Sequence, residues 1–173
     1  MELKELFNPE IIQKRVLELG EAISRDFQDK DIVAVCVLKG AAVFYADLIR
    51  ALNIDMEMDF VRLSSYGNNQ FSSGNVNFSV DMETSITDRH VLIIEDIIDT
   101  GLSISHLLRI LKDRNPGSLN LCALIDKQER RQVQVQVDYT GFVLQEGFVV
   151  GYGLDYAQKY RNLPGIFQLA QDE

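Results

Sequence analysis

The stretch Val91–Ser103 limits most strongly what this chain can fold into. It opens with Val91–Ile94, an apolar, β-branched run typical of a strand buried on both faces of a parallel sheet. Two adjacent acids follow, then two isoleucines, a third acid and the small-residue turn Thr100–Ser103. Ser103 is predicted to cap a helix that runs through Leu111. A strand, a small-residue turn and a helix in this order predict a site for a phosphorylated sugar.

The residue types in this stretch suit different parts of such a ligand. Backbone amides in the turn and at the helix N-terminus favour a phosphate, and the Thr100 and Ser103 hydroxyls can add donors. Gly101 permits a close backbone approach. Glu95 and Asp96 repel phosphate, so ribose hydroxyls and a divalent cation are their natural partners. The alternative is a buried strand whose terminal acids are solvated or capped.

Apolar periodicity predicts the other elements. The expected helices and strands are a helix over 9–28, a strand over 32–38, a helix over 43–52, strands over 56–63, 74–80 and 119–125, an edge strand over 132–137, and short strands over 141–144, 148–151 and 166–169. Helices alternating with buried strands predict an α/β fold with a doubly wound, mainly parallel sheet in one domain over 1–173. Residues 56–81 are interpreted as an antiparallel arm with a mobile loop at 64–73; an ordinary hairpin is the alternative.

Charge and composition exclude several classes of function. The net charge of −9 argues against non-specific nucleic-acid binding, which needs a basic face. No apolar run approaches the ~18 residues that span a bilayer, and the charged opening Met1–Glu5 predicts no signal peptide. Cys36 and Cys122 lie in apolar runs and are expected to be buried thiols in a reducing compartment, so we expect a cytoplasmic protein.

Two further loops could join the site. Lys39-Gly40-Ala41-Ala42 connects a buried strand to a helix, a layout that suits phosphate but also fits a simple turn with an exposed lysine. The charged run 126–131 follows another buried strand. Loops at the carboxyl ends of parallel strands line the ligand crevice, although a charge run is more often a solvated surface.

The segment Glu95-Asp96-Ile97-Ile98-Asp99-Thr100-Gly101 resembles the phosphoribosyl-pyrophosphate (PRPP) motif of type I phosphoribosyltransferases, in the form carried by the hypoxanthine-guanine members. Phe148–Tyr156 is a second strong match, and Lys39-Gly40 and Ser65-Tyr66 are weaker ones. The resemblance spans about 32–161 and implies a small hood built from 1–8 and 148–173. It also implies that the Lys39–Gly40 peptide can be cis.

The resemblance implies transfer of a phosphoribosyl group from PRPP to hypoxanthine or guanine, giving IMP or GMP and pyrophosphate, with Mg²⁺ as cofactor. Asp99 is the implied general base. The implied contacts are Glu95 and Asp96 for ribose; Asp99, Thr100, Gly101, Leu102 and Ser103 for the 5′-phosphate; Lys39, Gly40, Arg131 and Arg161 for pyrophosphate; Ser65 and Tyr66 in a flexible loop that closes over the site; Lys127, Phe148, Val149 and Asp155 for the purine; and Asp155, Glu95 and Asp96 for the metal.

Two alternatives remain at this point. One is a phosphoribosyltransferase for xanthine or adenine, although Lys127 disfavours the 6-amino group of adenine. The other is a PRPP-sensing regulator without activity that binds RNA or protein, against which the acidic charge speaks. Leu102 stands where some relatives carry lysine, so anion binding would depend on backbone amides and hydroxyls. The apolar fraction permits a homodimer or homotetramer.

Overall fold

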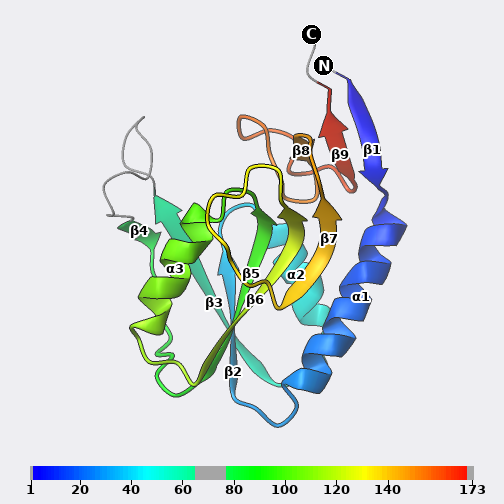
Figure 1. The fold of residues 1–173 in the computed structure, drawn as a ribbon. Coiled ribbons are helices and arrows are strands. Elements are labelled where there is room, and N and C mark those ends of the chain that lie inside the picture. The colour runs from blue at the N-terminus through cyan, green and yellow to red at the C-terminus, as the bar shows by residue number, and fades with distance from the viewer. Residues whose placement is uncertain (1, 65–76, 171–173) are drawn as a thin grey trace.

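The computed structural model describes residues 2–64 and 77–170 (Figure 1). The helices are α1 (Pro9–Asp26), α2 (Ala42–Ala51) and α3 (Leu102–Lys112). The strands are β1 (Leu3–Phe7), β2 (Ile32–Val37), β3 (Met56–Ser64), β4 (Asn77–Val80), β5 (His90–Ile98), β6 (Ser118–Lys127), β7 (Tyr139–Leu144), β8 (Val149–Val150) and β9 (Ile166–Leu169). No helix in these ranges is long and apolar enough to cross a membrane.

The central sheet has the strand order β4-β3-β2-β5-β6-β7. Its pairs are parallel except for β4, which runs antiparallel to β3. Alternate side chains of β2 explain why the sheet is covered twice: Ile32, Ala34 and Cys36 face the core under α1 and α2, whereas Val33 and Val35 face the core under α3. The predicted doubly wound, mainly parallel α/β fold is confirmed, because a continuous apolar run needs a layer on each face.

A second sheet of order β1-β9-β8 is wholly antiparallel. Figure 1 shows it beyond the carboxyl ends of the parallel strands. The ranges predicted for the hood, 1–8 and 148–173, contain its three strands. The role of this sheet as a hood stays a prediction.

Three sequence-based expectations about element boundaries were wrong. No strand forms over 132–137; β7 is the edge instead. The alternation in 132–137 is real, because Val135 and Val137 pack against the α3 core, but the segment pairs with no strand. Helix α3 begins at an N-cap Gly101 rather than Ser103, and β6 extends to Lys127. The predicted loop 64–73 falls outside the described residues from 65 onward.

Candidate active site

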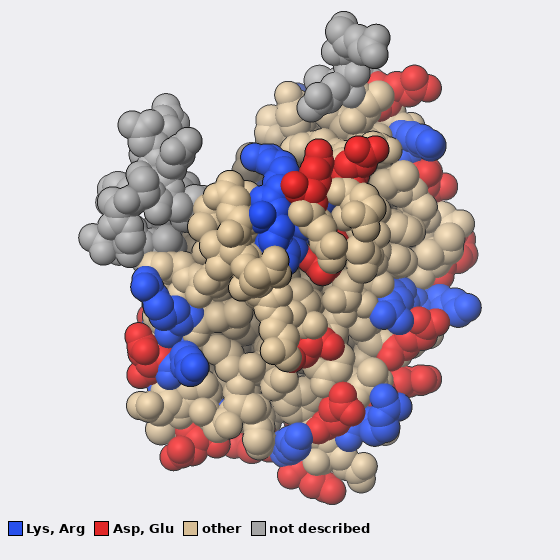
Figure 2. All heavy atoms as spheres, in the orientation of Figure 1, with Lys and Arg blue, Asp and Glu red and all other residues tan. Residues whose placement is uncertain are grey.

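Three turns meet at the carboxyl end of the central sheet. Strands β2, β5 and β6 are neighbours, and the chain leaves β2 toward β3 on one side and β5 toward β6 on the other. Their carboxyl ends therefore flank the point where the direction of winding changes, which is where open α/β sheets bind ligands. Figure 2 shows basic and acidic side chains side by side over this end of the sheet.

Glu95 and Asp96 lie near the carboxyl end of β5 and are half-buried. Glu95 Oε1 accepts the Asp96 amide at 3.1 Å, and Asp96 Oδ1 accepts the Ile97 amide at 2.8 Å. Burial and the adjacent Asp96 charge raise the pKa of Glu95 well above its usual range. Burial also raises the pKa of Asp96, although hydrogen bonds from Glu95 and the Ile97 amide oppose this. Both acids therefore favour a partner that compensates for lost water.

The turn after β5 leaves amides available for an anion. Gly101 has a φ of 83°, a left-handed conformation that favours glycine, and it is the N-cap of α3. Gly101 has no side chain with which to cap this helix. The Thr100 hydroxyl accepts the Leu102 amide at 3.3 Å. Ser103 lies inside the first helical turn instead of capping it, because Gly101 has taken that place. The helix N-terminus thus keeps free N–H groups and a positive dipole end.

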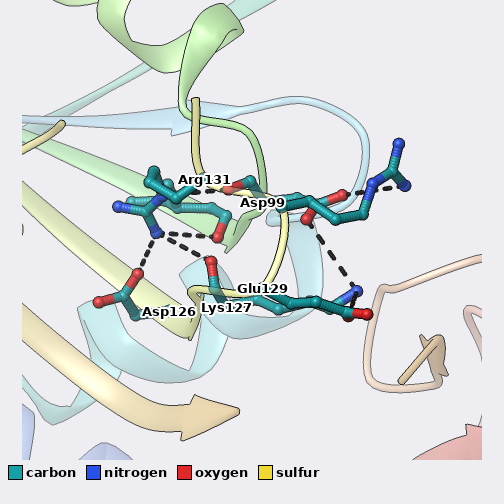
Figure 3. A network of polar contacts seen from close by, with 7 residues as sticks. Asp99, Asp126, Lys127, Glu129 and Arg131 are labelled. Atoms are coloured by element: carbon teal, nitrogen blue, oxygen red, sulfur yellow. Dashed lines mark hydrogen bonds and ion pairs between the residues drawn. The ribbon is translucent and has the colours of Figure 1, made fainter. Parts of the chain in front are cut away.

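Asp99 carries a buried carboxylate oxygen beside two basic side chains. Its Oδ1 is buried and accepts no hydrogen bond from any described residue. Lys127 Nζ lies 4.0 Å from Oδ1, and Arg130 Nη1 lies 3.5 Å from Oδ2 (Figure 3). A buried acceptor without a donor is uncommon and indicates a ligand or a functional role. Asp99 can therefore accept a proton or a hydrogen bond from a bound molecule.

Lys127 is the last residue of β6, so it lies in the strand and not in a loop after residue 125. Its side chain is only 8% exposed, and Nζ lies 3.3 Å from Glu129 Oε2 as well as near Asp99. The strand therefore fixes its backbone while the ammonium group points into the same network as Asp99 (Figure 3). This places a rigid donor beside a free acceptor.

The turn after β2 packs against two other parts of the site. The cis peptide bond is Leu38–Lys39, one position earlier than the predicted Lys39–Gly40. A Cβ atom at Gly40 would overlap the Asp96 carboxylate, and one at Gly153 would overlap Gly40 O. The Lys39–Gly40 turn therefore lies between the acids of β5 and the segment that follows β8.

That segment brings the remaining predicted residues together. Asp155 Oδ1 pairs with Arg161 Nη2 at 2.7 Å, and Arg161 Nη1 donates to Gly153 O at 2.7 Å. The Phe148 ring is 41% exposed and contacts Tyr156 edge-on, with ring centroids 5.6 Å apart. Val149 is buried within β8. Phe148 thus keeps a partly free face, which suits stacking on an aromatic ligand.

Ser65 and Tyr66 lie outside the described residues. Sequence reasoning missed two residues that shape the site, Asp126 and Gly153. Asp126 forms an ion pair with Arg131, and Gly153 contacts the Gly40 turn with a φ of 101°. The run Gly151-Tyr152-Gly153 was a usable signal for left-handed backbone, whereas nothing local distinguished Asp126 from its charged neighbours.

The oxygen donors suit a magnesium ion that arrives with its substrate. No group of three His, Cys, Asp or Glu side chains in the described ranges could hold a metal alone. Mg²⁺ usually takes one or two carboxylates and completes its shell with substrate phosphates and water. Glu95 and Asp96 are half-buried, and their raised pKa values reflect the cost of unpaired negative charge. A cation would relieve that cost, so the donor set fits the ion.

Comparison with known proteins agrees with this geometry. The chain matches the model of the phosphoribosyl transferase domain over residues 2–157. It is 47% identical over 163 residues to the hypoxanthine-guanine phosphoribosyltransferase of Bacillus subtilis (strain 168), covering 94% of this chain and 91% of the relative. It is 45% identical over 162 residues to the hypoxanthine-guanine-xanthine phosphoribosyltransferase of Tritrichomonas foetus, covering 93% and 88%.

Solved structures give the same answer. The crystal structure of a hypoxanthine-guanine phosphoribosyltransferase from Bacillus anthracis superposes with a TM-score of 0.92 at 44% identity, covering 98% of this chain and all (100%) of that one. The overall fold is thus shared with a solved structure, and the family model matches most of the chain. The chain belongs to the phosphoribosyltransferases.

Proposed function

We infer that the protein transfers the 5-phosphoribosyl group from PRPP to hypoxanthine or guanine, giving IMP or GMP and pyrophosphate in purine salvage. One observation carries this inference. The buried acceptor Asp99 Oδ1, the buried Lys127 ammonium and the N-terminus of α3, whose N-cap is Gly101, all meet at the end of β5 and β6. They offer an acceptor for a purine N–H, a donor for its 6-oxo group and amides for a phosphate.

The reaction follows from how these groups are placed. Loss of pyrophosphate gives the ribose C1 oxocarbenium character, and the nearby carboxylates of Glu95 and Asp96 stabilise that positive charge while they bind the ribose hydroxyls. Asp99 accepts the N7 proton as the new bond forms to N9. Lys127 donates to the exocyclic oxygen of the base, and Phe148 stacks on its ring. Positioning both reactants supplies much of the rate.

Pyrophosphate leaves from the side of the Lys39–Gly40 turn and Arg161. Glu95, Asp96 and Asp155 would hold Mg²⁺ together with PRPP, and the ion would supply positive charge to the leaving group. Arg161 pairs with Asp155 at 2.7 Å, so this arginine and the metal ligand are already adjacent. The cationic side chain and the amides of the turn then bind the departing anion.

The cellular setting is inferred from the same features. Cys36 and Cys122 are free and buried. Burial and the charges of Glu95 and Asp96 raise the pKa of Cys36 to about 12, so it stays a thiol. Such thiols suit the cytoplasm. Exposed apolar side chains on the sheet, Met58 and Phe60, favour a homodimer or homotetramer, which light scattering of the purified protein would measure.

Nucleotide formation with four bases tests the activity. The protein, PRPP and Mg²⁺ are incubated with hypoxanthine, guanine, xanthine or adenine, and product and pyrophosphate are measured. We expect turnover with hypoxanthine and guanine and none with adenine, because Lys127 needs an acceptor at position 6. Turnover with xanthine is the second candidate, favoured by the similarity to the Tritrichomonas foetus enzyme. No nucleotide from any base would leave a regulator as the better interpretation.

Asp99→Asn separates chemistry from binding. The substitution keeps the size of the side chain but removes the basic oxygen, so we expect turnover to fall by about 10²–10⁴-fold. PRPP binding, measured by isothermal titration, should change far less, because the turn amides remain. Equal losses in turnover and PRPP affinity would remove Asp99 from the role of base.

A further inference from the structure

We propose that Arg131 is a positioning residue, which maintains the conformation of the 5′-phosphate turn by binding its carbonyls on the side away from the phosphate. This inference rests on the proposed function, since it assigns the 5′-phosphate to the turn Asp99–Ser103. It replaces direct pyrophosphate binding as the main role of Arg131.

The guanidinium of Arg131 is committed to backbone carbonyls. Nε donates to Asp99 O at 3.0 Å, and Nη2 contacts Ile98 O at 3.2 Å and Lys127 O at 3.0 Å (Figure 3). Nη2 also forms an ion pair with Asp126. The side chains of Arg131 and Asp126 are only 10% and 14% exposed. Most of the donors of this arginine are therefore used inside the protein.

The next two residues continue the same pattern. Gln132 and Val133 donate their amides to Thr100 O at 2.9 and 3.1 Å. The carbonyls of Ile98, Asp99 and Thr100 are thus all bound by the segment 131–133. Val133 O would lie 2.5 Å from a Cβ at Gly101, so the segment lies directly against the turn.

This arrangement matters because of how a backbone turn binds an anion. The amides must point toward the phosphate, so the carbonyls point the other way and need donors of their own. If those donors are lost, the carbonyls rotate toward other partners and the amides lose their common direction. Arg131 supplies donors for two successive carbonyls, which a lysine with a single ammonium group cannot reproduce in planar geometry.

Arg131 also joins the phosphate turn to the base site. The same Nη2 atom contacts Ile98 O in β5 and Lys127 O at the end of β6. Lys127 is the proposed donor to the purine oxygen. The position of the base relative to the 5′-phosphate is thus fixed through one guanidinium, with Asp126 balancing its charge.

The test compares ligands that differ by one phosphate. Dissociation constants for IMP, inosine and pyrophosphate with Mg²⁺ are measured by calorimetry for the wild type and for Arg131→Met and Arg131→Lys. We expect the affinity for IMP to fall about 10-fold, equivalent to about 1.4 kcal/mol, in both variants. Affinities for inosine and pyrophosphate should change less than about 2-fold, equivalent to about 0.4 kcal/mol, because neither ligand carries the 5′-phosphate. The preference for IMP over inosine therefore shrinks.

Arg15→Met is the matched control. Arg15 also holds two carbonyls, Gly141 O at 2.9 Å through Nε and Thr140 O at 2.7 Å through Nη2, but at the edge strand β7. It should lower the melting temperature and leave the preference for IMP over inosine unchanged. Loss of that preference in Arg15→Met would overturn the proposal, because general destabilisation would explain the effect.

Asp126→Asn keeps the test usable if Arg131→Met fails to fold. It retains Arg131 but removes its charged partner, so we expect a loss of IMP preference of about 3-fold, typical of weakening one hydrogen bond. An unchanged preference in Asp126→Asn overturns the proposal. Weaker pyrophosphate binding with intact IMP preference in the Arg131 variants also overturns it, in favour of direct contact. A wild type that binds IMP no better than inosine would instead refute the proposed function.

Discussion

Arg131 and Arg161 make the same kinds of contact beside two different turns. Each donates to a backbone carbonyl and pairs with an aspartate, Asp126 or Asp155. Arg131 and its partner are 10% and 14% exposed, whereas Arg161 and its partner are both 25% exposed. Arg131 serves the turn after β5, and Arg161 serves Gly153, which contacts the turn after β2.

The difference in burial separates two roles for one residue type. Arg161 can exchange part of its pairing with Asp155 for an incoming anion, because both side chains already contact solvent. Arg131 cannot do so without leaving buried carbonyls without donors, which is costly. We infer that the exposed arginine binds substrate and the buried one maintains the shape of the site.

Gly101→Ala would distort the turn that Arg131 supports and should have the largest effect. The φ of 83° strains alanine, and its Cβ would lie 2.5 Å from Val133 O. We expect turnover to fall about 100-fold, as for a misplacement of about 1 Å, with a stability loss of about 1–3 kcal/mol. Steady-state kinetics and thermal unfolding measure both.

Gly117→Ala is the control for that substitution. Its Cβ would meet Asp88 O at 2.8 Å, so it also crowds the backbone, but just before β6 begins, at the opposite end of the sheet. It should cost stability and leave turnover of the folded protein close to the wild type. Similar turnover losses in the two variants would show that stability alone is responsible.

Arg161→Gln tests whether Arg161 binds pyrophosphate, and we expect an effect of intermediate size. Removing the cation should weaken product inhibition by pyrophosphate about 10-fold, as expected for one charge-assisted contact of about 1.5 kcal/mol. Unfolding should change by less than about 1 kcal/mol, because partly exposed ion pairs contribute little. Arg50→Gln, which disrupts an exposed pair with Asp47, is the control. Unchanged pyrophosphate inhibition in Arg161→Gln would contradict the assigned role.

Glu95→Gln tests the acids that lie between the two turns, and its expected effect is a small shift in how stability depends on pH. The pKa of Glu95 is raised above its usual value of 4.5 by burial and by Asp96. The folded state therefore binds more protons than the unfolded state above pH 4.5, and wild-type stability falls as pH rises through the folded pKa. Glutamine has no charge to bury, so the variant should not lose stability as pH rises. We expect a higher melting temperature than wild type at pH 8 and little difference near pH 4.

Asp81→Asn provides a control of opposite sign. A hydrogen bond from Arg114 lowers the pKa of Asp81, so its contribution is present at neutral pH and is lost as pH falls through the folded pKa. Asn should therefore lower the melting temperature at pH 8 and match the wild type in acid. A Glu95→Gln protein less stable than wild type at pH 8 would argue that the carboxylate stabilises the fold.

Local sequence patterns were sufficient to predict the two layers of helices and the location of the site. Val91–Ile94 and Ile32–Val37 are continuous apolar runs. Strands of this kind are buried only when other elements pack on both faces of the sheet. The acids, Gly101 and the following helix are contiguous, so their grouping is a property of local chain order. These features needed no knowledge of distant residues.

The residues that support the site could be identified only from the folded structure. Val133, Val135 and Val137 alternate as a strand would, but the backbone of 132–133 is bound to Thr100 O. Arg131 and Asp126 lie more than twenty residues along the chain from the turn they hold. Gly40 and Gly153 are far apart in the chain, but in the fold a Cβ at Gly153 would overlap Gly40 O. Such contacts join residues that are far apart in the sequence, so local sequence patterns do not predict them.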